Sequence, residues 1–518
     1  MILARRCARI IAAALLATGP AWADQVRRPG ASMRVETGGY IDGLAVAPLG
    51  GPRQRPQAVT EVFFGTITRS WRTRVSLRGG VGGPFEGAEP GVMNLVHTFQ
   101  NRSPSVEVNE AWVELLLPDA DLRVGIQKFA WGKLDGPPPT DVLTPRDLHD
   151  PLVRDGEESK IGIPALQGRY FAPPISFLHM TDLRATLVYV PFASPPRLAL
   201  VKERWFPPSI TTSGLGVPER RAERLINDVI QEIIPGAPPI DLDGPLRVPI
   251  ELRTANNAPP KSVSAGGIAL RLEGTIHEMD WSVSHYTGPE TAPDAALLSI
   301  ASCRSCLTAL SQGRLPIRVQ TFLKQKHDVL HMTGADWSAV FGGATVRGEV
   351  AVFQNRPSLR DTEDLIAEAL TPAVVSRYGP RLVLNGRSRI PLGELFPDRD
   401  IVEWGIGVDY LINGFFPLLQ LNQVIFVDSG PPELTRDPET QLLLSIRRSF
   451  FKEKAELELR GLYAIEPGAW IVFPQASYRL GDHWRLRLSY LGIGGPTESF
   501  IGQFNANDEF VFEARYSF

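Results

Sequence analysis

Charged side chains recur at every second position in several segments of this chain. In "KAELELRGLYAI" at 454–465, Glu456, Glu458 and Arg460 alternate with apolar residues, and in "HWRLRLSYL" at 483–491, Arg485 and Arg487 do the same. No nucleophile and base accompany them, so the chemistry open to such side chains is electrostatic: they orient water and attract ions or polar groups. These residues therefore predict a polar surface that faces water and contacts ions or polar solutes.

The alternating segments together define one set of candidate residues. Acids and bases alternate between neighbouring segments, and most of them are expected to neutralise one another in ion pairs. We expect Arg347, Arg485 and Arg487 to be the best placed to contact anionic or polyhydroxylated solutes. The whole set comprises Arg123, Gln127, Arg271, Glu273, Arg347, Glu349, Glu403, Asp409, Gln420, Asn422, Glu456, Glu458, Arg460, Arg485 and Arg487.

A second cluster of candidates lies in the acidic segment 132–165. Its length and charge suit a loop that folds into a channel and constricts it, and its candidate residues are Asp135, Asp141, Arg146, Asp147 and Asp150. An ordinary solvated surface loop is the alternative. The carboxylates could also bind Ca²⁺, although no EF-hand spacing is present. We therefore expect no obligatory metal or cofactor.

The sequence offers little to catalysis or redox chemistry. Cys303 and Cys306 in "SCRSC" lack a second pair and a βα context, and in an exported protein they predict a local disulfide. There are eight histidines, but no G-x-S-x-G motif and no Ser-His pairing are evident. We expect that the protein is not an enzyme.

The elements that carry the charged residues are expected to be long β-strands. In "IVEWGIGVDYLI" at 401–412, apolar residues from Val402 to Ile412 alternate with Glu403 and Asp409. Alternation over about 10 residues is typical of strands that cross a membrane at a tilt. Aromatic residues lie toward the strand ends, where an interfacial girdle would place them. A soluble β-sandwich or propeller also alternates but does not explain these aromatics.

The two ends of the chain favour export and membrane insertion. Residues 1–23 have arginines, then an apolar run, then Ala21-Trp22-Ala23, which predicts a signal peptide with cleavage before Asp24. The rest of the sequence contains no run of about 18 apolar residues, so no membrane-spanning helix is expected. The last segment, "FVFEARYSF", alternates and ends in aromatic residues. The pattern predicts a strand that closes a barrel against its first strand. With Tyr516 and Phe518 on its outer face, this ending resembles the C-terminal signal of bacterial outer-membrane barrels, which implies recognition by the barrel-assembly machinery.

Connection lengths predict the topology of residues 24–518 as one barrel. Short periplasmic turns are expected around Asp119, Ser194, His277, Gly342-Gly343, Gly414 and Gly481-Asp482. Long extracellular or pore-folded loops are expected at 81–104, 132–180, 206–263, 288–327, 355–400 and 493–507. Short turns on one side and long loops on the other are the rule in outer-membrane barrels. The count is about 18 strands if a hairpin turns at Arg69-Ser70, and 16 if that stretch is one strand and the stretch from Met33 to Val46 is left out.

Two of the long loops are expected to contain helices. The segment "VPERRAERLINDVIQEIIPG", 217–236, places Leu225, Ile226, Val229 and Ile230 on one apolar stripe. A lid that packs on other loops explains this stripe, and a helix that binds a partner or the membrane surface is the alternative. The segment 358–370 has the same character.

One stretch resembles a known family. In "LRVGIQKFAWGKLDGPPPTDVLTPRDLHDP", 122–151, a strand with G-x-Q-x-x-x-W-G precedes D-x-x-x-P-x-D. This pattern resembles a broad group of single-chain bacterial outer-membrane porins, which includes the alginate-export type and related uncharacterised barrels. The resemblance implies passive diffusion through a fixed pore. It implies no particular solute.

The sequence therefore predicts an all-β transmembrane antiparallel barrel in the outer membrane of a Gram-negative bacterium. The predicted function is a porin or channel for small hydrophilic solutes, anionic or carbohydrate-like. The alternative is a non-transporting barrel, an adhesin, scaffold or envelope-structure protein that binds partners through its long loops. Expected partners are outer-membrane lipid, lipopolysaccharide and the assembly machinery. With 54 basic against 57 acidic residues, nucleic acid is not expected.

Overall fold

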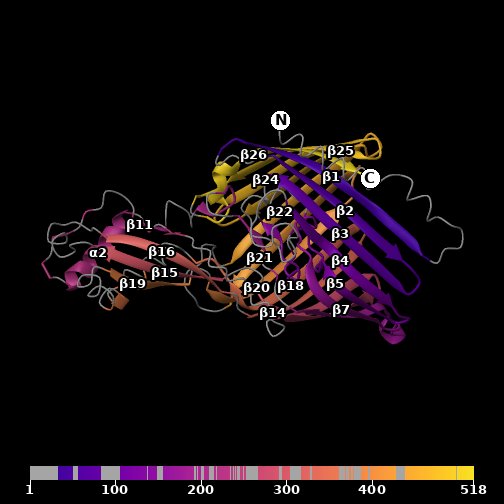
Figure 1. The fold of residues 1–518 in the computed structure, drawn as a ribbon, viewed down its shortest axis with the longest axis horizontal. Coiled ribbons are helices and arrows are strands. Elements are labelled where there is room, and N and C mark those ends of the chain that lie inside the picture. The colour runs from indigo at the N-terminus through magenta and orange to yellow at the C-terminus, as the bar shows by residue number, and fades with distance from the viewer. Residues whose placement is uncertain are drawn as a thin grey trace.

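Eighteen antiparallel strands of the computed structural model pair in one closed ring (Figure 1). The structure describes residues 33–518 except for 51–55, 83–104, 137, 149–155, 192–193, 195, 200–202, 209–214, 218, 234, 237, 240, 242–245, 249, 252–265, 291–293, 304–316, 327–328, 361–367, 369–370, 372, 375–376, 378–386, 395–396, 428–437 and 498. The predicted signal peptide, Asp150, Cys306 and most of the predicted helix at 358–370 lie outside the described residues.

The strands of the ring follow one another in chain order. They are β1 Arg34–Pro48, β2 Gln57–Ile67, β3 Trp71–Gly82, β4 Ser105–Leu116, β5 Ala120–Gln127, β7 Ile163–Phe171, β8 Met180–Val190, β13 Gly267–Ile276, β14 Met279–Pro289, β17 Val329–Phe341, β18 Ala344–Pro357, β20 Asp398–Tyr410, β21 Phe415–Phe426, β22 Glu439–Phe450, β23 Ala455–Ala464, β24 Ala469–Leu480, β25 Trp484–Gly494 and β26 Glu509–Ser517. The prediction of an 18-stranded antiparallel barrel is confirmed.

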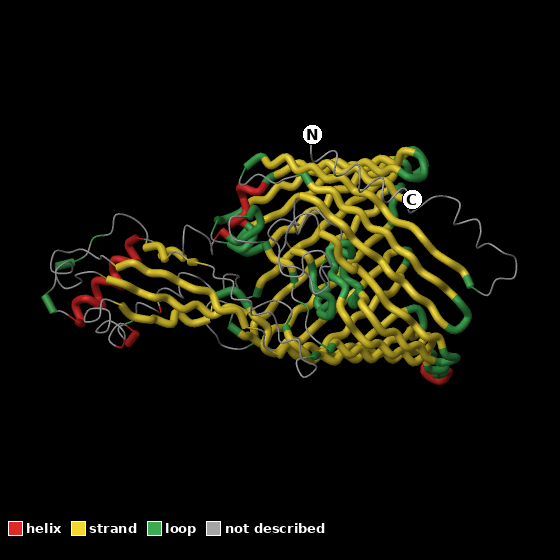
Figure 2. Tube along the Cα trace, viewed as in Figure 1, coloured by secondary structure: helices red, strands yellow, loops and turns green. Residues whose placement is uncertain are grey.

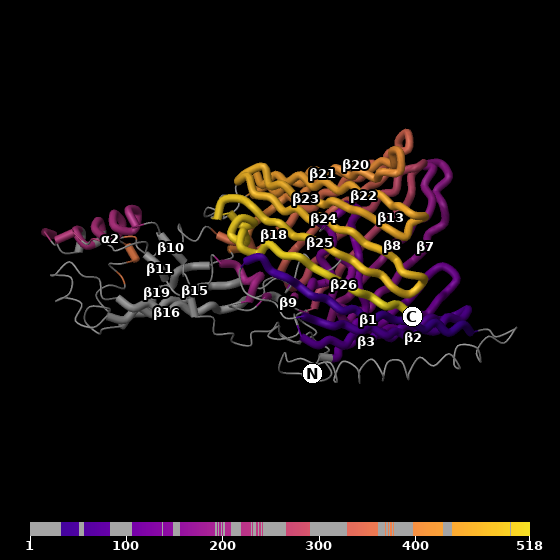
Figure 3. Tube along the Cα trace, turned by 90° about the horizontal axis from the view of Figure 1, so that it is seen from above, coloured from indigo at the N-terminus to yellow at the C-terminus, as the bar shows by residue number. Residues whose placement is uncertain are grey.

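The last strand closes the ring against the first. β26 pairs with β1 from Tyr40↔Ser517 to Pro48↔Glu509, and the two strands lie side by side in Figure 3. The terminal residue extends this seam, because Phe518 N donates to Gly39 O at 3.0 Å and Gly39 N donates to Phe518 O at 3.1 Å. Closure leaves no strand edge with unpaired backbone groups, which an apolar environment would penalise by several kcal/mol each.

Alternation separates an apolar outer wall from a polar inner one. On β5, Leu122 and Val124 are 44% and 54% exposed on the outside, while Arg123 between them binds Glu114 inside. On β26, Phe510 and Phe512 are exposed outside while Glu513 is buried inside. Exposed aromatics lie near the strand ends, among them Tyr170, Tyr410, Tyr463, Trp470, Tyr478 and Trp484. The outer wall therefore has the apolar band and aromatic ends of a transmembrane barrel.

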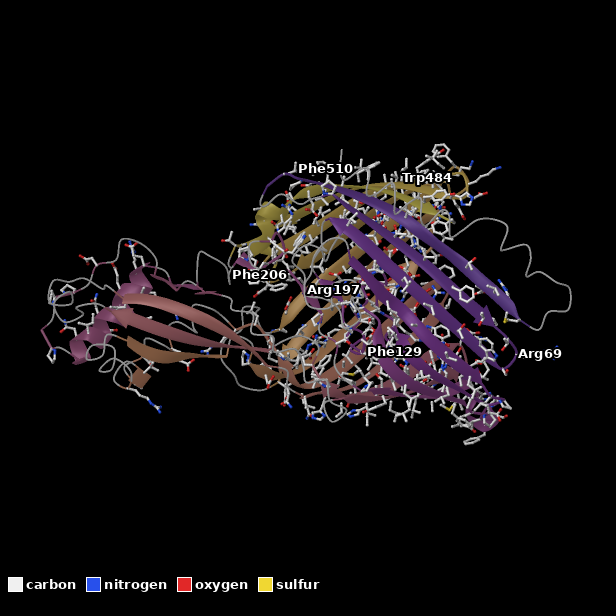
Figure 4. The ribbon with its side chains drawn as sticks, viewed as in Figure 1. Arg69, Phe129, Arg197, Phe206, Trp484 and Phe510 are labelled. Atoms are coloured by element: carbon white, nitrogen blue, oxygen red, sulfur yellow. The ribbon has the colours of Figure 1, made fainter. Side chains whose placement is uncertain are left out.

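Short turns gather at one end of the barrel, here called the turn end, and long connections at the other, the loop end. The hairpin between β2 and β3 turns at Arg69-Ser70, which excludes the 16-stranded alternative (Figure 4). The turn predicted around Ser194 is wrong, because β8 already ends at Val190 and Ser194 lies in the long loop-end connection that follows it. The predicted loop 132–180 is also too long, because it contains β7 and the turn-end connection with the 3₁₀ helix η2, Ser176–Leu178.

Three loop-end connections contribute further strands. β12 Ile250–Glu251, β16 Ile317–Lys326, β15 Asp294–Cys303 and β19 Arg387–Glu394 form a separate four-stranded sheet, and β10 Leu215–Val217 pairs with β11 Leu246–Val248. The predicted loop 288–327 therefore contains two long strands. These elements stand beyond the loop end of the barrel, at the left of Figure 1.

The predicted helix at 217–236 is confirmed by α2, Glu219–Ile233, in the same group of elements. Ala222, Ile226 and Ile230 on one of its faces are buried, as the apolar stripe requires. No helix in the described part of the chain is both long and apolar enough to cross a membrane.

Candidate functional site: the barrel lumen

The connection between β5 and β7, residues 128–162, folds into the barrel and is here called the lumen loop. Phe129, Trp131 and Leu143 are 5%, 7% and 4% exposed and join one apolar cluster with inward residues of the wall, such as Met332 and Phe353. Figure 2 shows loop segments in green within the ring of strands. Burial of these side chains holds the loop against the wall from β7 to β21, so that part of the lumen is filled.

A single wall carboxylate anchors the first half of the lumen loop. Glu349 of β18 is 4% exposed and accepts hydrogen bonds from the backbone N–H groups of Lys133, Leu134 and Thr140 at 3.0, 3.3 and 2.7 Å. The Thr140 hydroxyl also donates to it at 2.7 Å. Four donors on one carboxylate fix the loop backbone, because each would otherwise lack an acceptor.

A glycine makes this close approach feasible. Gly132 has a φ of +86°, and a Cβ there would lie 2.7 Å from both carboxylate oxygens of Glu349. A side chain at this position would be strained by the backbone conformation and would displace the carboxylate. The last residue of the G-x-Q-x-x-x-W-G motif is therefore a requirement of the loop's inward turn.

The tip of the lumen loop is fastened by an ion pair and a reciprocal amide contact. Arg347 of β18 binds Asp135 at 2.5 Å and also binds Asp409 of β20. Asp135 N donates to Gln420 Oε1 and Gln420 Nε2 donates to Asp135 O, both at 2.9 Å. Burial raises the pKa of the Asp135 carboxyl, and the Arg347 guanidinium only partly offsets this effect.

The second half of the lumen loop reaches the opposite part of the wall. Glu158 binds Arg515 of β26 through both carboxylate oxygens, at 2.5 and 2.9 Å, and its carbonyl oxygen accepts from Arg78 of β3 at 3.0 Å. Since Glu349 and Gln420 hold the loop on one side and Arg515 and Arg78 hold it on the other, the lumen loop crosses the barrel. This position is that of a constriction.

The other predicted acids of the loop that the structure describes, Asp141 and Asp147, pair with cations of the chain. Asp141 contacts Arg146 at 2.7 Å and Lys160 at 3.0 Å, and also accepts from Trp131 N at 3.2 Å. Asp147 contacts Arg197 at 3.3 Å. Within the described residues, no three acidic, histidine or cysteine side chains converge as a metal site would require. The described carboxylates thus stabilise the loop's own fold.

A second connection also enters the barrel, and the sequence did not predict it. The described residues of 191–208, here called the mouth loop, follow β8, and within them β9, Arg197–Leu198, pairs in parallel with β6 of the lumen loop, Asp147–Leu148. Arg197 binds Glu107 of β4, and Arg204 binds Glu509 of β26 at 2.7 Å. Trp205 packs in an apolar cluster with Phe473, Leu491 and Ile493 on β24 and β25. Figure 4 shows Phe129 and Arg197 within the barrel outline.

One part of the wall stays open to solvent. Arg447 of β22 and Arg479 of β24 are exposed on the lumen side, and the side chains of Arg460 and Arg485 are 41% and 35% exposed. We call these four residues the arginine wall. Near them, Glu458 accepts from Ser445 and Gln475, and Arg460 lies 4.9 Å above the Phe473 ring. The lumen loop approaches this wall, because a Cβ on Gly136 would lie 3.5 Å from Leu443 of β22.

Most other predicted lumen residues are engaged in ion pairs. Arg123 binds Glu114 at 2.7 Å, Arg271 binds Glu273 and Asp336, both at 2.9 Å, and Glu403 binds Arg356 at 2.9 Å. Arg485 and Arg487 share Glu513. Glu456 accepts from Ser449 at 3.5 Å, and Asn422 accepts from Gln420 at 2.9 Å.

Gln127 is fully buried, and its amide donates to Ala165 O of β7 at 2.9 Å. It therefore supports the start of the lumen loop and does not face open space.

No protein-family model matches the chain, and no curated protein matches its sequence. Solved structures with a similar arrangement include OccAB4 of Acinetobacter baumannii, at 9% identity, 95% coverage of this chain, 100% of that one and a TM-score of 0.45. OpdK of Pseudomonas aeruginosa has 10% identity, 94% and 99% coverage and a TM-score of 0.44. OmpF of Salmonella typhi, in complex with daunomycin, has 9% identity, 94% and 98% coverage and a TM-score of 0.38.

The geometry of the chain itself is that of a porin-like β-barrel: a closed 18-stranded ring with long connections folded into its lumen.

Proposed function

We propose that this protein is an outer-membrane channel of a Gram-negative bacterium, for passive diffusion of small hydrophilic solutes. The observation that carries the proposal is the lumen loop, which a wall carboxylate, Glu349, holds across a polar lumen. An apolar, aromatic-ended outer wall suits lipid, and a closed ring leaves no backbone group unsatisfied there. The turn end would face the periplasm and the loop end the cell exterior.

The arginine wall favours solutes that carry negative charge or many hydroxyl groups. Arg447, Arg460, Arg479 and Arg485 present donors toward the part of the lumen that the loops leave open. Guanidinium groups bind carboxylates through paired hydrogen bonds and also donate to hydroxyl oxygens. We therefore propose anionic or carbohydrate-like solutes as the preferred class.

The final strand supports the proposed route of assembly. Tyr516 lies 5.1 Å from the Trp484 ring and 6.3 Å from the Phe518 ring, which gathers aromatics at the turn end of the closing seam. We propose that Tyr516 and Phe518 form the signal that the barrel-assembly machinery reads, and that lipid and lipopolysaccharide surround the outer wall.

A non-transporting barrel is the second candidate. It is favoured by the two loops that enter the lumen and by the separate sheet with α2 beyond the loop end, which would offer partners an extended surface. In that case the lumen loop would act as a plug.

Liposome swelling with the refolded protein separates these two functions. Glucose, glucosamine and glucuronate are similar in size and differ in charge, so their rates of entry report size limit and charge preference together. A channel as proposed admits all three and admits glucuronate fastest. Folded, heat-modifiable protein that admits none of them would exclude the channel and favour the plugged barrel.

A further inference from the structure

Glu158 occupies a carboxylate-binding position on the barrel wall. Arg515 meets its two oxygens with two different nitrogens, at 2.5 and 2.9 Å, which is the paired geometry by which guanidinium recognises carboxylates. The side chain of Arg515 is 11% exposed, and its guanidinium also lies 4.4 Å above the Tyr40 ring. Arg515 thus binds the Glu158 carboxylate in the same geometry as it would bind the carboxylate of a solute.

The wall around this position is built to hold its arginines in place. Asp42 of β1 binds Arg515 at 3.0 Å, Glu61 of β2 binds Arg78 at 3.3 Å, and Glu513 binds both Arg485 and Arg487. Wall carboxylates thus hold each of these arginines in position, and Glu158 adds a loop carboxylate to the set at Arg515.

A small cavity adjoins the pair. Tyr40, Gln57 and Arg487 line it together with Glu158, Arg515 and the two arginine-paired carboxylates Asp42 and Glu513, so polar side chains of β1, β2, β25 and β26 face the same space. A solute carboxylate that replaced Glu158 at Arg515 would find further hydrogen-bonding groups there.

We propose that Glu158 is a tethered competitor: its side chain fills a wall site at Arg515 that otherwise binds the carboxylate of a solute, and a solute enters this site by displacing it. The inference rests on the proposed channel function and adds a carboxylate subsite to it. Because a site that is open for only a fraction of the time binds its ligand more weakly by that fraction, removal of Glu158 strengthens binding.

Propionate is the probe of choice, because it has the same end group as a glutamate side chain. Its dissociation constant is measured by saturation-transfer NMR on detergent-solubilised full-length protein, so conduction is not needed for the readout. Glu158→Gln is expected to lower that constant about tenfold, the result for a site that Glu158 occupies about nine-tenths of the time. Propionamide, which lacks the charge, should bind none of the variants.

Two further variants serve as controls. Glu157→Gln removes the same charge one residue away, from a side chain that is 71% exposed and contacts Lys160, and should bind propionate as the wild type does. Glu158→Asp keeps the charge but withdraws the carboxylate by one methylene, so an intermediate constant is expected.

Equal constants for wild type, Glu158→Gln and Glu157→Gln would overturn the inference, and so would weaker binding by Glu158→Gln. Either result would leave the proposed channel standing if the wild type still admits solutes. Conversely, a barrel that binds propionate as expected but admits no solute would refute only the channel.

Discussion

Arg347 of β18 binds the carboxylate of Asp135 at 2.5 Å, and the same guanidinium binds Asp409 of the neighbouring strand β20. One wall arginine thus joins a strand of the barrel to the tip of the loop that crosses the lumen. The Asp135 side chain remains 42% exposed, so this contact borders the solvent-filled part of the lumen. The charges at the constriction are therefore set by a loop residue and a wall residue together.

Asp135 should make ion selectivity depend on pH. Its pKa is raised above the usual 3.8, chiefly because the carboxyl is partly removed from solvent, so on acidification it loses its negative charge before carboxyls with an ordinary pKa. Anion preference, read from the reversal potential in a salt gradient, is expected to rise as the pH falls from 7 toward the acid range. Asp135→Asn is already neutral, so at pH 7 it should show a higher anion preference than the wild type and a smaller rise on acidification. If anion preference in this variant changes with pH as it does in the wild type, other groups cause the effect.

Glu349 should decide whether the lumen loop stays in place. Glu349→Ala removes the acceptor of three backbone N–H groups and one hydroxyl, so we expect larger and noisier channel openings. Loss of these bonds should also lower the free energy of unfolding in urea by about 1–3 kcal/mol. Glu456→Ala removes a lumen carboxylate that contacts Ser449 of the neighbouring strand β22, and should leave the conductance nearly unchanged. Equal conductance in wild type and Glu349→Ala would contradict the loop's role as the constriction.

Arg447 and its neighbour Arg448 offer a matched test of the arginine wall. Arg447 faces the lumen above the Phe416 ring, whereas Arg448 faces outward and contacts the Phe415 and Phe450 rings. Arg447→Gln should reduce anion preference, because it removes an exposed positive charge from the passage. Arg448→Gln removes the same charge outside and should leave the reversal potential unchanged. Equal shifts in both variants would show that the lumen side of β22 does not border the ion path.

The packing of β1 against its two neighbours, β2 and the C-terminal end of the chain, can be tested with two glycines of β1. A Cβ on Gly39 would lie 2.2 Å from Glu61 O and 2.9 Å from the Phe518 ring, whereas a Cβ on Gly43 would have its nearest neighbour at 3.9 Å. Gly39→Ala is therefore expected to destabilise the closed barrel by about 1–3 kcal/mol, since the backbone must shift. Gly43→Ala should fold normally. The folded fraction of each variant after refolding is measured by its heat-modifiable mobility. A fully folded Gly39→Ala would argue against tight packing around β1 at this position.

The barrel itself could be predicted from the sequence because its signal is repeated. Alternation determines which side chains face outward. The alternation of short and long connections determines that the number of strands is even. The strand at Ile163–Phe171 was missed because it lies inside a long polar stretch and is followed by a connection that resembles a loop. The turn expected at Ser194 was wrong for a related reason: Pro and Ser residues mark a chain reversal but not the end of the barrel at which it lies.

The lumen was harder to predict, because ion pairs across it join residues far apart in sequence. Glu349 was recognised as an inward residue, but nothing local shows that its partners are the backbone of residues 133–140. Arg197 and Arg204 of the mouth loop gave no signal, since neither lies in an alternating segment. The motif at 125–132 was the strongest sequence signal for the inward turn of the lumen loop. Gly132 and Trp131 are required where the chain leaves β5 and turns into the barrel.

Single-channel recording of the refolded wild-type protein in a planar bilayer tests the central claim most directly. With a salt gradient across the membrane, the proposed channel gives steady openings and a reversal potential of the sign for anion preference, which Arg447→Gln reduces. Protein that is folded, as judged by its heat-modifiable mobility, but passes no current would contradict the claim and favour a barrel plugged by its inner loops.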